Sequence, residues 1–388
     1  MNKVQKTKLG DLIEFQRGYD LPKSSFVNGK YPVISSNGVL GYHNAYKVKG
    51  PGITIGRSGT VGLPQYIKSD YFPHNTALFI KNFKGNFPRY IYYLLKTFSL
   101  NNRKTGSGVP TMNRNHLHPL IVSAYLDLKD QKNIASVLSS LDSKIELNNK
   151  INAELEQMAK ALYDYWFVQF DFPDINGKPY KSSGGKMIWS KELKREIPER
   201  WEVKTLNKAV NIFDSKRIPL SNMQREKMKG QYPYYGATSI MDYVNDYIFD
   251  GEYILLAEDG SVIDEKGLPI VQFIWGRTWV NNHAHVLQPK VAANSEYLFH
   301  FLKTISVVQI MTGSIQKKIN QENLMSVNLA FPDKNTLESF SKFTIPTRKK
   351  LTNLIEENKK LTELRDWLLP ILMNGQVKVK IMDKDYGN

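Results

Sequence analysis

The chain repeats its own sequence at long range, and this repeat constrains the fold more than any other feature. Gly29-Lys30-Tyr31-Pro32 returns as Gly230-Gln231-Tyr232-Pro233, which is 201 residues later. Thr105-Gly106-Ser107 returns as Thr312-Gly313-Ser314, now 207 residues later, so one small insertion separates the two matches. This period is far longer than the roughly 20–50 residues of a solenoid repeat. The two halves therefore share one plan, which predicts a pseudo-two-fold internal repeat.

Each half begins with a segment that has the pattern of a globular domain. In the first half, short β-type stretches alternate with Gly, Pro and Asn turns, and residues 88–100 have apolar side chains at helical spacing. In the second half, residues 284–287 match the β-type stretch at residues 77–80. Residues 295–310 match the helical pattern at residues 88–100. We expect two α/β domains of the mixed α+β kind, at residues 1–129 and 201–335.

Each half ends with sustained heptads, which predict long helices at residues 130–166 and 336–375. Asparagines interrupt both apolar seams, and a polar seam residue can fix the register of a helix pair at a cost in stability. We expect the two helices to pair as an antiparallel coiled coil, with the alternative that each lies on its own domain. Pro346 is expected to bend or restart the second helix, and Pro370 with Asn374-Gly375 to end it. The predicted seam positions are Leu141, Ile145, Asn148, Asn152 and Leu155 in the first helix, and Leu351, Leu354, Asn358, Leu361 and Leu368 in the second.

The remaining segments are a connector and a tail. Residues 167–200 are rich in turn residues but contain aromatic side chains, so we expect an ordered connector that leads to the second domain. Residues 376–388 are expected to form a weakly ordered C-terminal tail.

The charge of the chain indicates the class of partner. It has 53 Lys and Arg against 37 Asp and Glu, a formal net charge of +16 that favours a polyanion, although a merely basic protein would show the same balance. It contains no cysteine, which excludes disulfides and thiolate metal sites. No signal peptide and no stretch of about 18 apolar residues is present. We expect a cytoplasmic protein that does not enter a membrane.

Signatures of catalysis are largely missing. The sequence has no P-loop, no Gly-x-Gly-x-x-Gly after a strand, and no Asn-Pro-Pro-aromatic tetrapeptide of the kind that amino-methyltransferases carry. Asp250, Asp264 and Lys266 could hold Mg²⁺ as in a nuclease, but solvated loops explain them more simply. We predict no catalytic residue in this chain.

Two pairs of histidines have a spacing that metal ligands can show. His116 and His118 alternate in the manner of a strand face, and so do His283 and His285. No acidic residue or further histidine accompanies either pair in the sequence. Ordinary hydrogen-bonding histidines are therefore favoured, and no metal site is predicted.

Two loops in each domain have the residues of a DNA-reading surface. In the first domain, a glycine-rich turn carries an arginine that can donate two hydrogen bonds to guanine or phosphate, and a second loop has cations at both ends. In the second domain, the turn carries carboxylates, which can accept hydrogen bonds from cytosine but repel phosphate. The two domains should therefore read different bases, unless both loops are plain hairpin ends. The candidate DNA-binding residues are Arg57, Ser58, Thr60, Lys104, Thr105, Ser107 and Arg114, and then Glu258, Asp259, Ser261, Ser314, Gln316, Lys317 and Lys318.

Three segments carry a resemblance to a known family. They are residues 147–167 (LNNKINAELEQMAKALYDYWF), Glu196-Ile197-Pro198-Glu199-Arg200-Trp201-Glu202-Val203, and Leu368-Leu369-Pro370-Ile371-Leu372-Met373-Asn374-Gly375. The chain is similar over essentially its whole length to the specificity subunit of Type I restriction-modification enzymes. In this family such segments are the conserved regions, and members diverge in the two target-recognition domains between them.

The resemblance implies a DNA-recognition subunit without catalysis of its own. Each target-recognition domain would read one half of a bipartite, asymmetric site in double-stranded DNA, and the antiparallel helices would set the spacer. The implied partners are two modification subunits, which supply S-adenosylmethionine and adenine methylation, and two motor-nuclease restriction subunits, which supply ATP and Mg²⁺ chemistry. This chain itself would bind no cofactor. The alternatives are a stand-alone nuclease or methyltransferase with duplicated domains, and a coiled-coil scaffold with basic heads.

Overall fold

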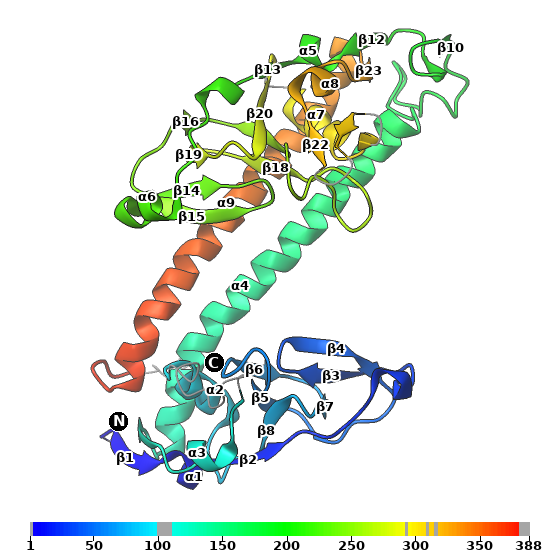
Figure 1. Cartoon of the computed structure of the whole chain (residues 1–388). Coiled ribbons are helices and arrows are strands. Elements are labelled where there is room, and N and C mark those ends of the chain that lie inside the picture. The colour runs from blue at the N-terminus through cyan, green and yellow to red at the C-terminus, as the bar shows by residue number, and fades with distance from the viewer. Residues whose placement is uncertain (1–2, 99–110, 292–293, 308–309, 314–316, 380–388) are drawn as a thin grey trace, which may run out of the picture. The chain divides into compact units, whose positions relative to one another are not determined.

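The computed structural model describes residues 3–98, 111–291, 294–307, 310–313 and 317–379. It contains two compact units, residues 1–150 with 354–388, and residues 151–353. Two long helices, α4 (Leu128–Tyr163) and α9 (Lys334–Met373), each contribute to both units (Figure 1). Within the described ranges no helix has the length and apolar character needed to cross a membrane.

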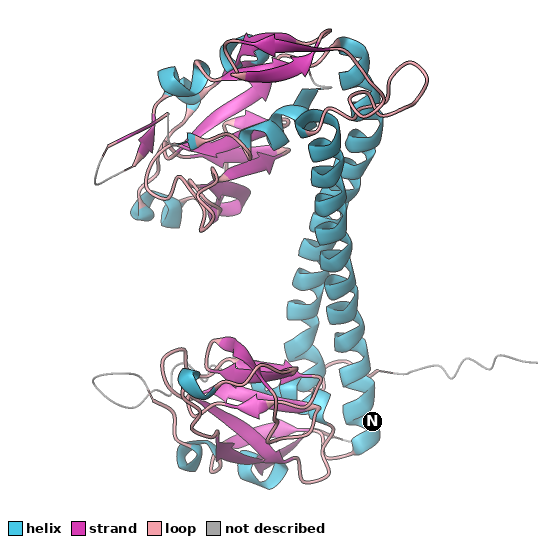
Figure 2. Cartoon of the chain, turned by 90° about the vertical axis from the view of Figure 1, so that its right-hand side faces the viewer, coloured by secondary structure: helices cyan, strands magenta, loops and turns pink. Residues whose placement is uncertain are grey.

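The globular part of unit 1 is built from antiparallel and mixed sheets (Figure 2). Its strands are β1 (Gln5–Lys8), β2 (Glu14–Arg17), β3 (Tyr31–Ser35), β4 (Gly38–His43), β5 (Gly52–Gly56), β6 (Pro64–Ile67), β7 (Phe72–Pro73), β8 (Ala77–Asn82) and β9 (Ile121–Ala124). Its short helices are α1 (Leu9–Leu12), α2 (Pro88–Lys96) and α3 (Arg114–Leu117). The strand orders are β2-β8-β5-β6, β4-β3-β7 and β1-β9.

Helix α2 closes the core of unit 1. Pro88 stands at its start, where a missing N–H costs nothing. Its apolar residues at helical spacing, Tyr90, Ile91, Leu94 and Leu95, are all buried. They belong to one hydrophobic cluster that also contains side chains from β5, β8, the start of α4 and the end of α9.

The globular part of unit 2 repeats this arrangement. Its strands are β10 (Met187–Ser190), β11 (Arg195–Pro198), β12 (Glu202–Thr205), β13 (Val210–Ile212), β14 (Lys229–Tyr235), β15 (Ile240–Val244), β16 (Phe249–Asp250), β17 (Tyr253–Ala257), β18 (Val271–Ile274), β19 (Arg277–Val280), β20 (Ala284–Pro289), β21 (Met311–Thr312), β22 (Lys318–Ile319) and β23 (Asn328–Phe331). Its helices are α5 (Leu206–Ala209), α6 (Asn222–Lys227), α7 (Ser295–Leu302) and α8 (Gln321–Met325). The sheets β13-β20-β17-β18, β15-β14-β19-β16 and β12-β23 correspond to the three sheets of unit 1.

The repeat extends to strand register. Val33 pairs with Phe72 in a parallel bridge between β3 and β7, and Tyr234 pairs with Trp279 in the same way between β14 and β19. The first residues of these pairs are 201 apart and the second are 207 apart, as in the sequence repeat. The change of offset falls between β17 and β18, in a loop closed by a bridge between Ile263 and Pro269. This loop is the small insertion that the sequence indicated.

The connector between α4 and β12 is folded against unit 2. It begins with a π-helical turn, Asp164–Val168, and contains the hairpin β10-β11. Phe172 stacks on Tyr180 at 4.7 Å between ring centroids and on Trp201 at 5.3 Å. Aromatic packing of this kind explains why a turn-rich segment holds a defined path.

Helix α9 corrects the expectation about its prolines. It runs without interruption through Pro346 and Pro370, so the prediction of a restart at Pro346 is wrong. Proline removes one N–H from the helix ladder. Pro346 and Lys342 are both exposed, so the Lys342 carbonyl, which Pro346 leaves without its helical partner, can be hydrated. The helix ends at Met373, just before Asn374 and Gly375.

The long helices contact each other in an antiparallel sense. In unit 1, Asp142 of α4 contacts Arg365 of α9, and the later residue Asn148 contacts the earlier residue Asn358. In unit 2, Trp166 follows the end of α4, and its ring centroid lies 5.6 Å from that of Phe340, which is earlier still in α9. The expectation of mixed α/β domains with two long helices in contact is confirmed.

Candidate nucleic-acid interface

The first candidate surface is the turn that follows β5 in unit 1. Gly56 has no room for a side chain, because a Cβ there would lie 1.8 Å from the carbonyl oxygen of Thr60. Gly59 has a φ of +83°, in the left-handed region that favours glycine. The glycines thus let the backbone fold tightly, with Arg57 and Ser58 half-buried and Thr60 exposed.

This turn is held beside the start of α3. The Met112 N–H donates to the Arg57 carbonyl at 2.9 Å, and Ser58 forms a β-bridge with Thr111. Arg57 Nη1 donates a long hydrogen bond of 3.5 Å to the Asn75 carbonyl. The structure therefore brings Arg57, Ser58 and Thr60 together close to α3, whose first residue, Arg114, is exposed. Lys104, Thr105 and Ser107 lie outside the described residues.

The same backbone frame recurs in unit 2. The Ile319 N–H donates to the Glu258 carbonyl at 2.8 Å, and Asp259 forms a bridge with Lys318. Each of these residues is the repeat counterpart of one in unit 1, at an offset of 201 for the turn and 207 for the second segment. The frame also shares a glutamine: Gln65 donates to the carbonyls of residues 35 and 36, and Gln272 to those of residues 236 and 237. Equivalent loops are thus held equivalently but carry different side chains.

Glu258 requires a correction, because it is not an exposed acceptor. Its exposed fraction is 9%, and its carboxylate pairs with Arg217 Nη1 at 2.5 Å and Lys318 Nζ at 3.0 Å. Burial alone would raise the pKa of Glu258, but the hydrogen bonds from Arg217 and Lys318 outweigh burial and hold the pKa below its ordinary value. The carboxylate is used inside the domain, so we remove Glu258 from the candidate base-contacting residues.

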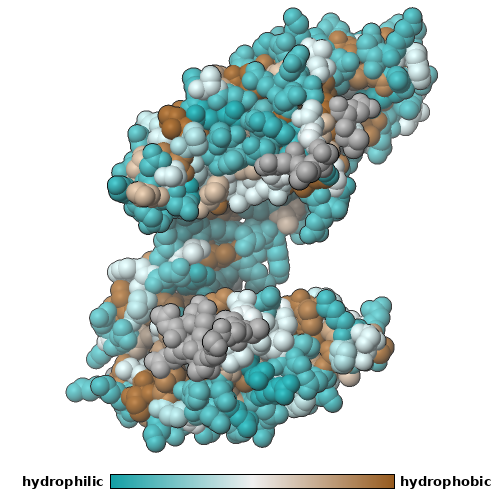
Figure 3. Space-filling view, viewed as in Figure 1, coloured by the Kyte–Doolittle hydropathy of each residue, from teal (hydrophilic) through white to brown (hydrophobic). Residues whose placement is uncertain are grey.

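The other candidates of unit 2 lie at the surface or near it. Ser261 and Lys317 are exposed, and the Lys318 side chain is 49% exposed although it pairs with Glu258. Asp259 is half-buried, and its carboxylate lies 2.6 Å from Nδ1 of His283. Ser314 and Gln316 fall outside the described residues. On the face visible in Figure 3, the described surface is mostly hydrophilic with scattered apolar spots.

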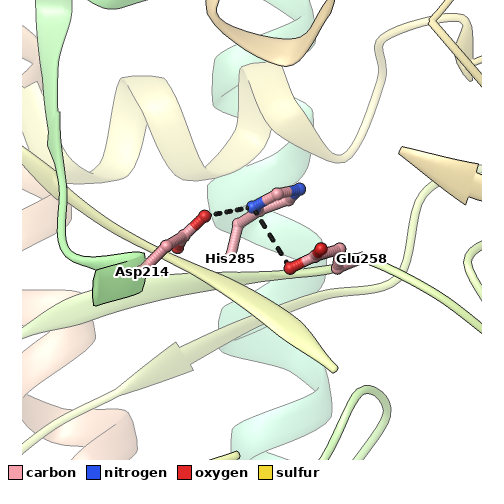
Figure 4. Close-up of side chains that lie close together, drawn as sticks. All are labelled: Asp214, Glu258 and His285. Atoms are coloured by element: carbon pink, nitrogen blue, oxygen red, sulfur yellow. Dashed lines mark hydrogen bonds and ion pairs between the residues drawn. The ribbon is translucent and has the colours of Figure 1, made fainter. Parts of the chain in front are cut away.

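His285 has acidic neighbours that the sequence did not reveal. Figure 4 shows its ring between two carboxylates, with Nδ1 at 2.6 Å from Asp214 and 3.7 Å from Glu258. The Nε2 atom lies 2.8 Å from the carbonyl oxygen of Ile319, and the ring is 1% exposed. A carboxylate and a carbonyl are both hydrogen-bond acceptors, so each ring nitrogen of His285 faces an acceptor. The statement that no acidic residue accompanies this pair is therefore wrong.

This cluster nevertheless has the character of an ion network and not of a metal site. Among the described residues, Asp214, Glu258 and His285 are the group whose spacing would suit a cation. Arg217 already supplies positive charge to it, at 2.5 Å from Glu258 and 3.6 Å from Asp214. Moreover, neither nitrogen of His285 can ligate a metal without losing a hydrogen bond. The network ties β20 to the Glu258 turn and to β22.

The first histidine pair and the acidic candidates behave as ordinary residues. His116 and His118 lie in α3 and at its C-terminal end, so the expected strand alternation is wrong. His118 Nε2 accepts from the Phe15 N–H at 3.0 Å, and burial is the main cause that lowers its pKa. Asp250 pairs with Arg277, whereas Asp264 accepts the N–H groups of residues 266 and 268 within its own loop. These carboxylates stabilise local structure.

Two of the predicted seam residues, Asn148 and Asn358, contact each other across the long helices. Asn148 is fully buried, and its amide donates to Glu357 at 2.8 Å and to Asn358 at 2.9 Å. Leu351 and Leu354 are buried as well. The remaining seam positions are half-buried, namely Leu141, Ile145, Asn152, Leu155, Leu361 and Leu368. Between Leu361 and Leu368, Arg365 faces α4 through its ion pair with Asp142, and Leu364 is exposed.

Sequence reasoning missed the ionic contacts that support these surfaces. Besides the His285 network, they include pairs between the globular parts and the long helices, Arg89 with Asp142 and Glu296 with Arg348. Heptad and strand patterns contain no information about such pairs, because charged residues are expected at the surface. Alignment of the two halves would have signalled them, since Arg89 and Glu296 occupy equivalent positions.

Comparisons with known proteins agree with the repeat. Residues 1–157 and 198–357 match the family model described as Type I restriction modification DNA specificity domain. The Type I restriction enzyme MjaIX specificity subunit of Methanocaldococcus jannaschii is 25% identical over 76% of this chain and 70% of its own length. The HindI specificity subunit of Haemophilus influenzae is 22% identical over 90% and 84%. A crystal structure of a Type I restriction-modification S subunit from M. genitalium has a TM-score of 0.64 at 16% identity, covering 96% of each chain, which shows a shared fold.

Proposed function

We propose, because this chain belongs to the DNA specificity subunits of Type I restriction-modification systems, that its two units are target-recognition domains that each read one half of a bipartite DNA site. Specificity subunits are the non-catalytic part of these enzymes. One observation carries the proposal: the same hydrogen-bonded frame holds Arg57, Ser58 and Thr60 in unit 1 and Glu258, Asp259 and Ser261 at the equivalent positions of unit 2. A repeated scaffold with different side chains suits a protein that reads two different short sequences.

Charge supports a polyanionic partner. The net charge of +16 favours DNA through phosphate contacts that are independent of sequence. Thr60 and Arg114 in unit 1, and Ser261 and Lys317 in unit 2, are exposed donors on the candidate loops. Bases would then be read by Arg57, which can donate two hydrogen bonds to guanine, and by Asp259, which can accept from cytosine. The recognised site is thus expected to be asymmetric.

The long helices would set the distance between the two half-sites. Helix α4 has 36 residues, which corresponds to about 54 Å at 1.5 Å per residue. Asn148 and Asn358 support this role, because a buried polar pair disfavours slippage of one helix along the other. Longer or shorter helices should therefore move the half-sites apart or together.

The chain is part of a Type I restriction-modification complex, and catalysis belongs to other subunits. We expect two modification subunits, which carry S-adenosylmethionine, and two restriction subunits, which carry ATP and Mg²⁺. This chain is expected to bind none of these cofactors. If the purified chain alone cut or methylated DNA, the stand-alone enzyme would replace the proposed function.

Substitution of Arg57 tests the reading of the first half-site. The full-length chain with its modification subunits is bound to a library of DNA duplexes, and bound sequences are counted for the parent and for Arg57→Ala. Loss of a base contact should cost about 1–3 kcal/mol and relax one position of one half-site. Arg200→Ala, which removes an exposed arginine of the connector, is the matched control and should leave the preference unchanged. Unchanged binding to every duplex by Arg57→Ala would remove Arg57 from the interface.

A further inference from the structure

Each unit contains an ion pair that joins its globular part to a long helix. In unit 1, Arg89 of α2 places Nη2 at 3.1 Å from Oδ2 of Asp142 on α4. In unit 2, Arg348 of α9 donates from Nε and Nη2 to the two carboxylate oxygens of Glu296 on α7, at 2.5 and 3.0 Å. The two pairs thus make the same kind of connection in the two halves.

The paired residues are repeat counterparts with opposite charge. Arg89 and Glu296 precede Tyr90 and Tyr297, which match in the sequence repeat, and each is the second residue of its helix. Asp142 and Arg348 lie equally far from the first residues of α4 and α9. Unit 1 therefore has the cation on the domain and the anion on the long helix, whereas unit 2 has the reverse.

The neighbouring side chains determine which sign of charge is favoured at Asp142 of α4 and at Arg348 of α9. Asp142 also accepts from the Tyr93 hydroxyl at 2.5 Å and from Arg365 Nη1 at 3.0 Å, so its position is built for an anion. Arg348 lies over the rings of Phe273 and Phe299, at 4.4 and 4.8 Å, so its position is built for a cation.

Because these side chains are largely buried, the sign of each charge matters for stability. The side chains of Arg89 and Asp142 are 17% and 18% exposed, and those of Arg348 and Glu296 are 13% and 5% exposed. Removing the partner of a buried charge is strongly destabilising, and a like charge in its place is worse. Water cannot compensate for a mismatch at these positions as it does at the surface.

We propose that these two pairs form a polarity code that decides which recognition domain can dock on which long helix. Helix α4 accepts a domain that brings a cation at the position of Arg89, and α9 accepts one that brings a carboxylate at the position of Glu296. Exchange of the domains would place Glu296 against Asp142 and Arg89 against Arg348. The halves are therefore alike in fold but not exchangeable, and this inference requires no assumption about DNA.

A charge-swap cycle in the full-length chain tests the code. Glu296→Arg reproduces the clash of an exchanged first domain, and Arg348→Asp reproduces that of an exchanged second domain. The double variant restores an Arg–Asp pair of the unit 1 polarity. Each single change should lower the melting temperature by about 5–10 °C. The double variant should regain part of this loss, because it removes the like-charge contact but leaves a carboxylate beside the rings of Phe273 and Phe299. Lys350→Asp, which makes the same charge change at an exposed site of α9, should have little effect.

A second arm covers the case in which the single variants do not fold. Arg89→Lys keeps the sign in unit 1 and Arg89→Glu reverses it, so only the second should destabilise the chain severely. Recovery of a folded chain in the Glu296→Arg and Arg348→Asp double variant, where both singles fail, supports the code equally. The pairs are not a code if the double variant lowers the melting temperature by the sum of the two single losses. They are also not a code if Arg89→Glu has the same melting temperature as Arg89→Lys.

Discussion

At the scale of single residues, the two halves separate what holds a loop from what the loop presents. Backbone groups of Arg57 and Glu258 make equivalent hydrogen bonds, to Met112 and Ile319 respectively. Their side chains differ in use, since the Arg57 guanidinium is half-exposed whereas the Glu258 carboxylate is buried in an ion network. The type of a loop residue thus predicts which hydrogen bonds its side chain can make, but not whether the side chain is accessible to DNA.

His300 is expected to make unit 2 sensitive to acid. Burial, followed by the nearby cations Lys303, Arg348 and Lys160, lowers the pKa of His300 to about 3. The unfolded chain binds a proton near pH 6.5 and the folded one does not, so stability is full above pH 6.5 and falls as the pH drops below it. At pH 5 the loss should reach about 2 kcal/mol relative to pH 7.5.

Replacement of His300 checks this prediction. His300→Phe keeps a ring beside Tyr163 but cannot take up a proton. Among the described residues, Nε2 of His300 has no hydrogen-bond partner, and it lies 3.7 Å from a carboxylate oxygen of Glu296, a contact that the substitution also removes. Denaturant unfolding of both chains at pH 7.5 and pH 5 gives the comparison. An equal loss of stability in the two chains on acidification would assign the effect to other groups.

At the scale of elements, periodic patterns predicted both long helices, whereas the expected restart of α9 at Pro346 was wrong. The heptads located the two long helices, because apolar periodicity is a direct consequence of helix pairing. Pro346 did not restart α9, because its exposed position in an otherwise packed helix outweighs one missing hydrogen bond. The ion network around His285 was not predictable in this way, since it joins residues from β13's end, β17's end, β20 and β22.

A matched deletion of one heptad from each long helix tests the spacing element. Residues 151–157 and 349–355 face each other by the register of the flanking contacts, Asn148 with Asn358 and Trp166 with Phe340. Removing both segments shortens the helix pair by about 10 Å while the seam stays in phase. The preferred spacer should shrink by about three base pairs with the half-sites unchanged.

The control for this experiment deletes the same heptad from α4 alone. That change breaks the register between the helices, so it should abolish recognition and not shorten the spacer. Methylated sites are compared among the three chains. A spacer that stays the same after the matched deletion would show that the helices do not set it.

At the scale of the whole molecule, the sequence repeat predicted that each half carries one domain and one long helix. It did not predict the opposite polarity of the two domain–helix joints, because the repeat was recognised from similar residues and Arg89 and Glu296 differ. The repeat also did not predict which candidate DNA-binding residues lie close together, since only tertiary contacts bring Ser58 beside Thr111. The repeat in the fold was thus accessible from sequence, whereas the chemistry of the site was accessible only in part.

The first half alone should pair with a second copy of itself. Residues 1–200 contain a complete seam and retain the Arg89–Asp142 pair, although Asp142 loses Arg365. Asn148 and Asn152 of one copy can meet those of the other in an antiparallel pair. Sedimentation should find a dimer, and with modification subunits it should direct methylation to a palindromic version of the first half-site. A monomer, or a dimer that recognises an asymmetric site, would contradict the idea that each half is a self-contained unit of one domain and one long helix.

Methylation mapping shows whether this chain directs modification to a bipartite site. Genomic DNA is sequenced for modified adenine from cells that express this chain together with its modification subunits, and from cells that lack only this chain. We expect one bipartite, asymmetric motif with two short half-sites and a spacer of fixed length, present only when this chain is present. A continuous motif, or methylation that persists without the chain, would contradict it.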